Sequence, residues 1–145
     1  MTEKLKLFPA ETEDEAEQEP GQEAEQEEGS ETVLYNNEAS SFIVNKALEY
    51  IKEHYKEKIR LQDVADYVFV SQWHLSKLLN KHTGQNFSEA LNKARIAQAK
   101  ELLKDPSMRI YDIAEEVGFQ DLAHFSRVFK KLEGISANEY RNKLT

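Results

Sequence analysis

Apolar residues recur with helical spacing from about residue 39 to the end of the chain. Ile43, Ala47, Ile51 and Tyr55 follow one another at intervals of four, which places their side chains on one face of an α-helix. A shorter run with the spacing i, i+3, i+4, i+7 begins at Leu61. No stretch alternates between apolar and polar residues for long, as a half-buried strand would. The pattern predicts an all-α body with about seven helices.

Polar residues and glycines mark where several of these helices begin and end. Ser71 stands at the N-cap of a helix that runs to about His82, and Gly84 follows just past its end. A long helix is predicted over residues 87–104. It stops before Pro106, because proline lacks the N–H group and clashes with the preceding turn.

The unit of a short helix, a turn and a longer helix occurs twice. Leu61, Val64, Ala65 and Val68 correspond to Ile110, Ile113, Ala114 and Val117, each 49 positions later. Residues 75–79 correspond to residues 125–129 at a spacing of 50. Two helices joined by such a turn are typical of a helix-turn-helix. The sequence therefore predicts one helix-turn-helix over about 39–84 and a second over about 107–145, joined by the long central helix.

The charge is divided unevenly along the chain. Residues 1–40 contain 2 Lys and 13 Asp or Glu, a net charge of −11, whereas residues 41–145 contain 17 Lys or Arg and 14 Asp or Glu, a net charge of +3. The segment 11–31 has almost no side chain that could bury apolar area, and ordering a residue costs roughly 1–2 kcal/mol. We therefore predict an acidic, disordered tail over residues 1–38 and a folded domain over residues 39–145.

Three interpretations of the tail remain open: a solvated linker, an acidic arm that competes with DNA for the basic surface of the body, or a product of cloning or truncation. The mean charge of −8 describes the tail more than the body. It therefore does not exclude nucleic-acid binding.

Several function classes are excluded by what the sequence lacks. The chain has no cysteine, which excludes disulfides, a thiolate nucleophile and a cysteine-ligated zinc site. The four histidines lack ligand spacing, and no catalytic constellation is present, so we predict no metal, no cofactor and no enzymatic activity. No apolar run approaches the ~20 residues of a membrane span, and no secretory signal is evident. We expect a cytoplasmic protein without membrane contact.

The second helix of each copy has a buried stripe and a free face when successive residues are stepped by ~100°. The stripes consist of Leu75, Leu78, Leu79 and His82 in the first copy and Phe125, Val128, Phe129 and Leu132 in the second. The opposite faces carry Trp73, Lys77, Asn80 and Lys81, and Ala123, Arg127, Lys130 and Lys131. Cations beside small or hydrogen-bonding groups suit the major groove of DNA. The outward direction of Trp73 argues against its burial.

These residues resemble the DNA-binding domain of AraC/XylS-type transcriptional regulators, including relatives of the YesN type. The resemblance covers about residues 40–143 and rests on the segments 71–77, 113–121, 124–131 and 139–141. It implies two helix-turn-helix subdomains tied by the central helix, whose second helices enter successive major-groove segments. It also implies that Trp73, Ser76 and Lys77, and Leu122, Ala123, His124 and Arg127, face the bases, with Gln72 and Asn80 near the backbone.

Two departures from the family pattern concern helix ends. Arg60 stands where a hydroxyl cap is customary, so we expect that helix end to fray. Ala137 replaces the usual proline before the last helix, but Ser136 and Glu139 can form a capping box there.

The sequence thus predicts a regulator that binds a specific sequence of double-stranded DNA and reads two adjacent major-groove segments, with RNA polymerase as a further partner. The alternative is a helical protein-interaction module that keeps the scaffold but has little DNA affinity. The small net charge of +3 on residues 41–145, beside the acidic tail, supports this alternative. The effector or dimerisation domain that such regulators usually carry is not visible in this chain.

Overall fold

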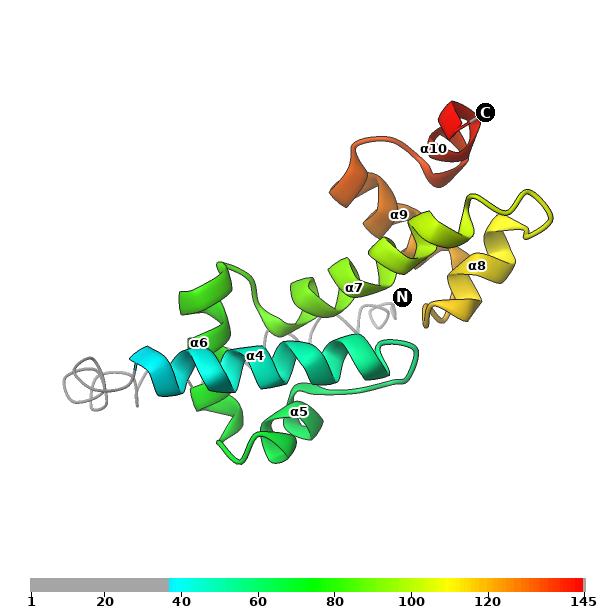
Figure 1. Cartoon of the computed structure of the whole chain (residues 1–145). Helices are drawn as coiled ribbons and strands as arrows, with labels where there is room; N and C mark the ends of the chain where they lie inside the picture. Colours follow the sequence, from blue (N-terminus) through cyan, green and yellow to red (C-terminus); the bar gives the residue numbers. More distant parts are fainter. Residues whose placement is uncertain (1–36, 145) are drawn as a thin grey trace, which may run out of the picture. The chain divides into compact units, whose positions relative to one another are not determined.

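The computed structural model describes residues 37–144, which form seven helices and no strand (Figure 1). The helices are α4 (Asn37–His54), α5 (Leu61–Tyr67), α6 (Gln72–Thr83), α7 (Phe87–Leu102), α8 (Ile110–Glu116), α9 (Leu122–Glu133) and α10 (Ala137–Leu144). The all-α prediction is confirmed for these residues. The predicted acidic tail, up to residue 36, lies outside the described residues.

The described residues divide into two compact units. The first comprises residues 37–50 and 60–88, and the second comprises residues 51–59 and 89–144. In the first unit α5 and α6 bury Leu61, Val64, Leu75 and Leu79. In the second, aliphatic side chains of α7 and α8 surround Phe125 and Phe129 of α9. The central helix, predicted over residues 87–104, ends at Leu102 and contributes directly to this second core.

The turn between the short and the long helix has the same backbone hydrogen bonds in both units. Val70 N donates to Ala65 O at 3.1 Å, and the corresponding Phe119 N donates to Ala114 O at 3.0 Å. The residue before each of these donors has positive φ, 62° at Phe69 and 107° at Gly118. The helix-turn-helix is therefore duplicated in the backbone as well as in the sequence.

The longer second helices of the two units, α6 and α9, also begin and end alike. The Ser71 hydroxyl accepts a hydrogen bond from His74 N at 3.0 Å, and the Asp121 carboxylate accepts one from His124 N at 2.7 Å. Each side chain satisfies an amide that the helix itself leaves without a partner. At the other end Gly84 and Gly134 adopt φ of 75° and 84°. The helix start and stop predicted at Ser71 and Gly84 are confirmed.

The predicted buried stripes are confirmed at Leu75, Leu78 and Leu79 and at Phe125 and Phe129. Val128 is half-buried, and the last turn of either helix is not buried. His82 is exposed, and the equivalent Leu132 is 43% exposed. The reason is a difference in helix length, since α5 and α8 have 7 residues each and α6 and α9 have 12. A short helix of ~10 Å cannot cover a helix of ~18 Å to its end.

The two helix ends that depart from the family pattern each have a hydrogen-bonded first turn. At the start of α5 the Asp63 carboxylate accepts a hydrogen bond from Arg60 N at 2.8 Å, and the fraying of this end stays a prediction. The capping box before α10 is confirmed. Ser136 N donates to Glu139 Oε1 at 3.1 Å, and Glu139 N donates to Ser136 Oγ at 3.0 Å.

Candidate nucleic-acid interface

The outer face of α6 is polar and cationic, with one aromatic ring. Gln72, Asn80 and Lys81 are exposed, whereas Trp73, Ser76 and Lys77 are half-buried. The Lys77 Nζ atom lies 5.5 Å from the centre of the Trp73 ring, a cation–π contact. The prediction that Trp73 stays out of the protein interior is wrong in part, because its Nε1 atom is shielded from solvent.

Two amide side chains of α6 are held by hydrogen bonds. Gln72 Nε2 donates to Gln62 Oε1 at 2.7 Å, and Gln62 Nε2 donates in turn to Asp66 Oδ1 at 2.7 Å, so Gln72 braces the start of α6 against α5. Asn80 Nδ2 donates to Ser76 O at 3.2 Å, one turn earlier in the helix. Both side chains are thus oriented by contacts within the same unit.

The outer face of α9 is more exposed. Ala123, Arg127, Lys130 and Lys131 are exposed to solvent, and Leu122 is 38% exposed. His124 is half-buried, and its ring lies edge-on to Phe119 with the ring centres 5.3 Å apart. His124 therefore helps to pack the first turn of α9 as well as bordering its outer face.

Corresponding positions on the two helices, 50 residues apart, carry related but unequal side chains. Lys77 corresponds to Arg127 and Lys81 to Lys131, so each face has two cations one turn apart. Trp73 corresponds to Ala123, and Asn80 to Lys130. The two faces thus share a charge pattern but differ in shape and in hydrogen-bonding groups.

Four exposed cations of these faces take part in no ion pair within the described residues, whereas five cations elsewhere do. Among residues 37–144, ion pairs join Lys46 to Glu49, Lys56 to Glu116, Lys100 to Glu133, Lys104 to Glu101 and Arg109 to Asp112. Within the same residues no ion pair involves Lys81, Arg127, Lys130 or Lys131. α6 contains no acidic residue, and Glu133, the acidic residue of α9, contacts Lys100 at 3.1 Å.

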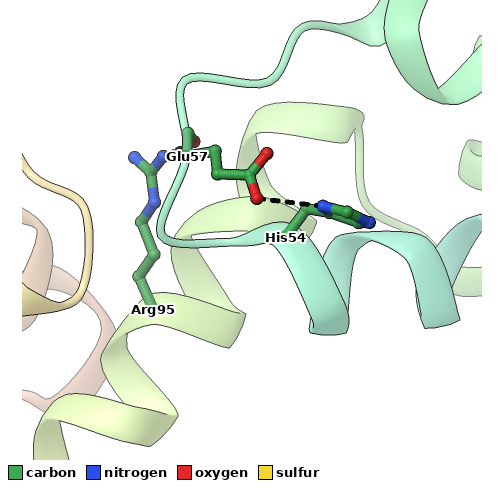
Figure 2. A network of polar contacts seen from close by, with 3 residues as sticks. All are labelled: His54, Glu57 and Arg95. Carbon is green, nitrogen blue, oxygen red and sulfur yellow. Dashed lines mark hydrogen bonds and ion pairs between the residues drawn. The ribbon is translucent and has the colours of Figure 1, made fainter.

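A buried arginine, Arg95, supports the second unit. Figure 2 shows Arg95 extending from α7 toward the segment that follows α4, where His54 also contacts Glu57. Arg95 Nε donates to Tyr55 O at 2.7 Å, and Nη2 donates to Glu57 O at 2.9 Å. Burial lowers the pKa of Arg95 to about 10, so the guanidinium remains charged at neutral pH.

The guanidinium of Arg95 is connected to α9 through aromatic rings. Its Cζ atom lies 5.5 Å from the centre of the Phe119 ring, and Phe119 lies edge-on to Phe125 at 5.4 Å. Sequence reasoning from composition and periodicity missed this positioning role. The available signal was an arginine directly before Ile96, on the buried side of the predicted central helix.

Neither a cluster of metal ligands nor a membrane-spanning helix is found in the described residues. Between residues 37 and 144 no three His, Asp or Glu side chains come together as metal ligands would. None of the helices in this part of the chain combines the length and hydropathy that a membrane crossing requires.

Comparison with protein families and solved structures agrees with the two helix-turn-helix units. A family described as "Helix-turn-helix domain" matches residues 64–143, more than half of the chain. The regulatory protein PocR of Salmonella typhimurium is 35% identical over 101 residues, which is 70% of this chain and 33% of PocR. The chain spans about a third of the length of the first curated relatives that it matches.

Solved structures match over similar portions. The C-terminal domain of AraT, a response regulator from Geobacillus stearothermophilus, is 37% identical with a TM-score of 0.65, covering 70% of this chain and 84% of that one. An AraC-type transcriptional regulator from Chromobacterium violaceum is 27% identical with a TM-score of 0.69, covering 74% and 96% of the two chains.

Proposed function

Because the chain belongs to the AraC-type family of helix-turn-helix DNA-binding transcriptional regulators, we propose that it binds a specific double-stranded DNA sequence through the outer faces of α6 and α9. Each face would enter one segment of the major groove, so that a single chain reads two adjacent segments. The observation that carries the proposal is the repeated pair of cations, Lys77 with Lys81 and Arg127 with Lys131, on corresponding positions of two equivalent helices.

Some side chains of the two faces would contact phosphates and supply affinity, and others would contact bases and supply sequence specificity. Ion-pair formation with phosphates supplies affinity, and the exposed Lys81, Lys130 and Lys131 suit that role because they form no ion pair within the described residues. Arg127 can donate two parallel hydrogen bonds to a guanine edge. Trp73 and Ala123 offer apolar surface to the methyl group of thymine. The differences between the faces predict unequal half-sites.

We also propose that the protein works in the cytoplasm, where it would act on DNA, and that RNA polymerase is a further partner. The rival function is a helical protein-interaction module with little DNA affinity.

The salt dependence of binding to a duplex selected from random sequences tests the proposal. Neutralising about six phosphates gives a slope near −5 for the logarithm of the binding constant against the logarithm of the salt concentration. A slope near zero, or no duplex selected at all, would favour the interaction module.

Arg127→Ala is expected to weaken binding by about 1–3 kcal/mol and to relax sequence preference only in the half-site that α9 contacts. Arg109→Ala is the matched control, because Arg109 precedes α8 and pairs with Asp112 at 3.5 Å. Repeating the selection with each variant measures both effects. An Arg127→Ala variant with the parental affinity and the parental site would show that the α9 face is wrongly assigned.

A further inference from the structure

Within the 12 residues of α9, Glu133 is the one acidic residue, and Arg127, Lys130 and Lys131 supply positive charge to the outer face. Glu133 lies one turn after Phe129, which is fully buried, so its side chain leaves the helix on the inner side. It also follows Lys130 by three residues, and side chains with this spacing are neighbours on a helix surface, with Cβ atoms about 5–6 Å apart. The carboxylate of Glu133 can therefore be drawn to either side.

Lys100 of α7 holds this carboxylate on the inner side of α9. Its Nζ atom lies 3.1 Å from Glu133 Oε1, and the two side chains are only 34% and 22% exposed. The same Nζ atom lies 5.7 Å from the centre of the Tyr140 ring on α10. That ring packs edge-on against Phe129, with the ring centres 5.6 Å apart. The ammonium group thus contacts both α9 and α10 within the second unit.

The partial burial of this ion pair makes the loss of its cation consequential. The pair between Lys104 and Glu101 is far more open, with side chains 59% and 62% exposed. A shielded pair is screened less by salt, and a shielded carboxylate that loses its cation is left with poor hydration. Without Lys100 the Glu133 carboxylate would gain by turning outward. Lys130, three residues away on the same helix, is the cation that it would meet there.

We infer that Lys100 is a positioning residue for DNA binding, because it keeps the Glu133 carboxylate away from Lys130 and so preserves the positive charge of the α9 outer face. The inference rests on the proposed function, since this charge matters only where the face meets phosphates. A carboxylate beside Lys130 would offset one of the three positive charges of α9 and repel the DNA backbone. Lys100 thus controls affinity through Glu133 and makes no contact with DNA itself.

Four full-length proteins distinguish this role from a purely structural one: the parent, Lys100→Met, Glu133→Gln and the variant with both changes. Methionine keeps an unbranched apolar side chain beside Tyr140 and removes the charge. Lys104→Met is the matched control, because it removes the same charge from a lysine that pairs with Glu101 of α7 at 3.1 Å. Circular dichroism establishes that each protein keeps the helix content of the parent. Lys100→Gln takes the place of Lys100→Met if methionine lowers that content.

Fluorescence anisotropy with the selected duplex between about 0.05 and 0.3 M salt measures affinity and salt slope. Lys100→Met is expected to bind about three- to tenfold more weakly at low salt, with a slope shallower by about 1. Glu133→Gln, the double variant and Lys104→Met are expected to stay within about twofold of the parent, because none of them places a carboxylate on the outer face. Parental affinity of Lys100→Met, or equal weakening in Lys100→Met and the double variant, would overturn the inference.

The side-chain ¹⁵Nζ signal of Lys130, recorded without DNA, keeps the inference and the proposed function apart. A charge-assisted contact with Glu133 is expected to shift this signal in Lys100→Met, and the signal is expected to return to its parental position in the double variant. A parental signal in Lys100→Met would overturn the inference even if DNA binding is weakened. If the signal shifts as expected but no protein binds any duplex, the positioning of Glu133 by Lys100 is upheld and the proposed function fails.

Discussion

Neutralising four cations on the outer faces of α6 and α9 is expected to reduce affinity for the selected duplex on the order of a hundredfold to a thousandfold. The variant changes Lys81, Arg127, Lys130 and Lys131 to Gln. If each cation meets one phosphate, the slope of the logarithm of the binding constant against the logarithm of the salt concentration becomes shallower by about 3 to 4. Fluorescence anisotropy with a labelled duplex between about 0.05 and 0.3 M salt measures both quantities.

The matched control removes the same charge from other surfaces. Lys46, Lys56, Lys104 and Arg109 each pair with a carboxylate, and changing all four to Gln gives the same net charge. Exposed ion pairs contribute only about 0–1 kcal/mol each, so this protein is expected to stay folded. Its salt slope should remain that of the parent. Equal losses of affinity in the two variants would mean that net charge, and not the two recognition faces, determines binding.

Gly118→Ala is expected to destabilise the second unit by about 3 kcal/mol or more. Gly118 has a φ of 107°, which L side chains rarely adopt. A Cβ atom there would lie 2.8 Å from Tyr55 O and 2.9 Å from Arg95 Nε, atoms that already form a hydrogen bond with each other. The new methyl group must therefore displace the buried guanidinium or the backbone. Urea unfolding followed by circular dichroism measures the loss.

Phe69→Ala supplies the control, because Phe69 occupies the corresponding position in the first unit. Its φ is 62° and its side chain is 91% exposed, so that turn already accommodates a Cβ atom and little packing is lost. The free energy of unfolding of the Phe69→Ala protein is expected to stay within about 0.5 kcal/mol of that of the parent. A Gly118→Ala protein equally close to the parent would contradict the role given to the contacts around Arg95.

Much of the fold could be predicted because its signals are local. The spacing of Leu61 and Val64 repeats 49 residues later, and Ser71 and Gly84 sit at helix ends where backbone geometry favours them. The repeated spacing predicts the same short helix, turn and longer helix in both units, as the structure has them. Likewise, the positions of Lys77 and Arg127 on outer helix faces follow from the helical period alone.

The predictions that failed concern side chains whose burial and contacts depend on residues far away in the sequence. His82 and Leu132 continue the apolar stripe on a helical wheel, but α5 and α8 are too short to cover them. Trp73 lies opposite Leu75 on a helical wheel, yet its side chain is half-buried and its Nε1 atom is shielded from solvent. The role of Arg95 depends on carbonyl groups 38 and 40 residues earlier in the chain. Helical periodicity carries no information about contacts of that range.

Backbone amide chemical shifts of the ¹⁵N-labelled full chain, followed during titration with the selected duplex, test the central claim most directly. The account predicts that the largest shifts fall on residues 72–81 of α6 and 122–131 of α9. The outer positions of Lys46 on α4 and Arg109 before α8 should change little. Largest shifts on α4 or α10, or no shifts at saturating duplex, would contradict it.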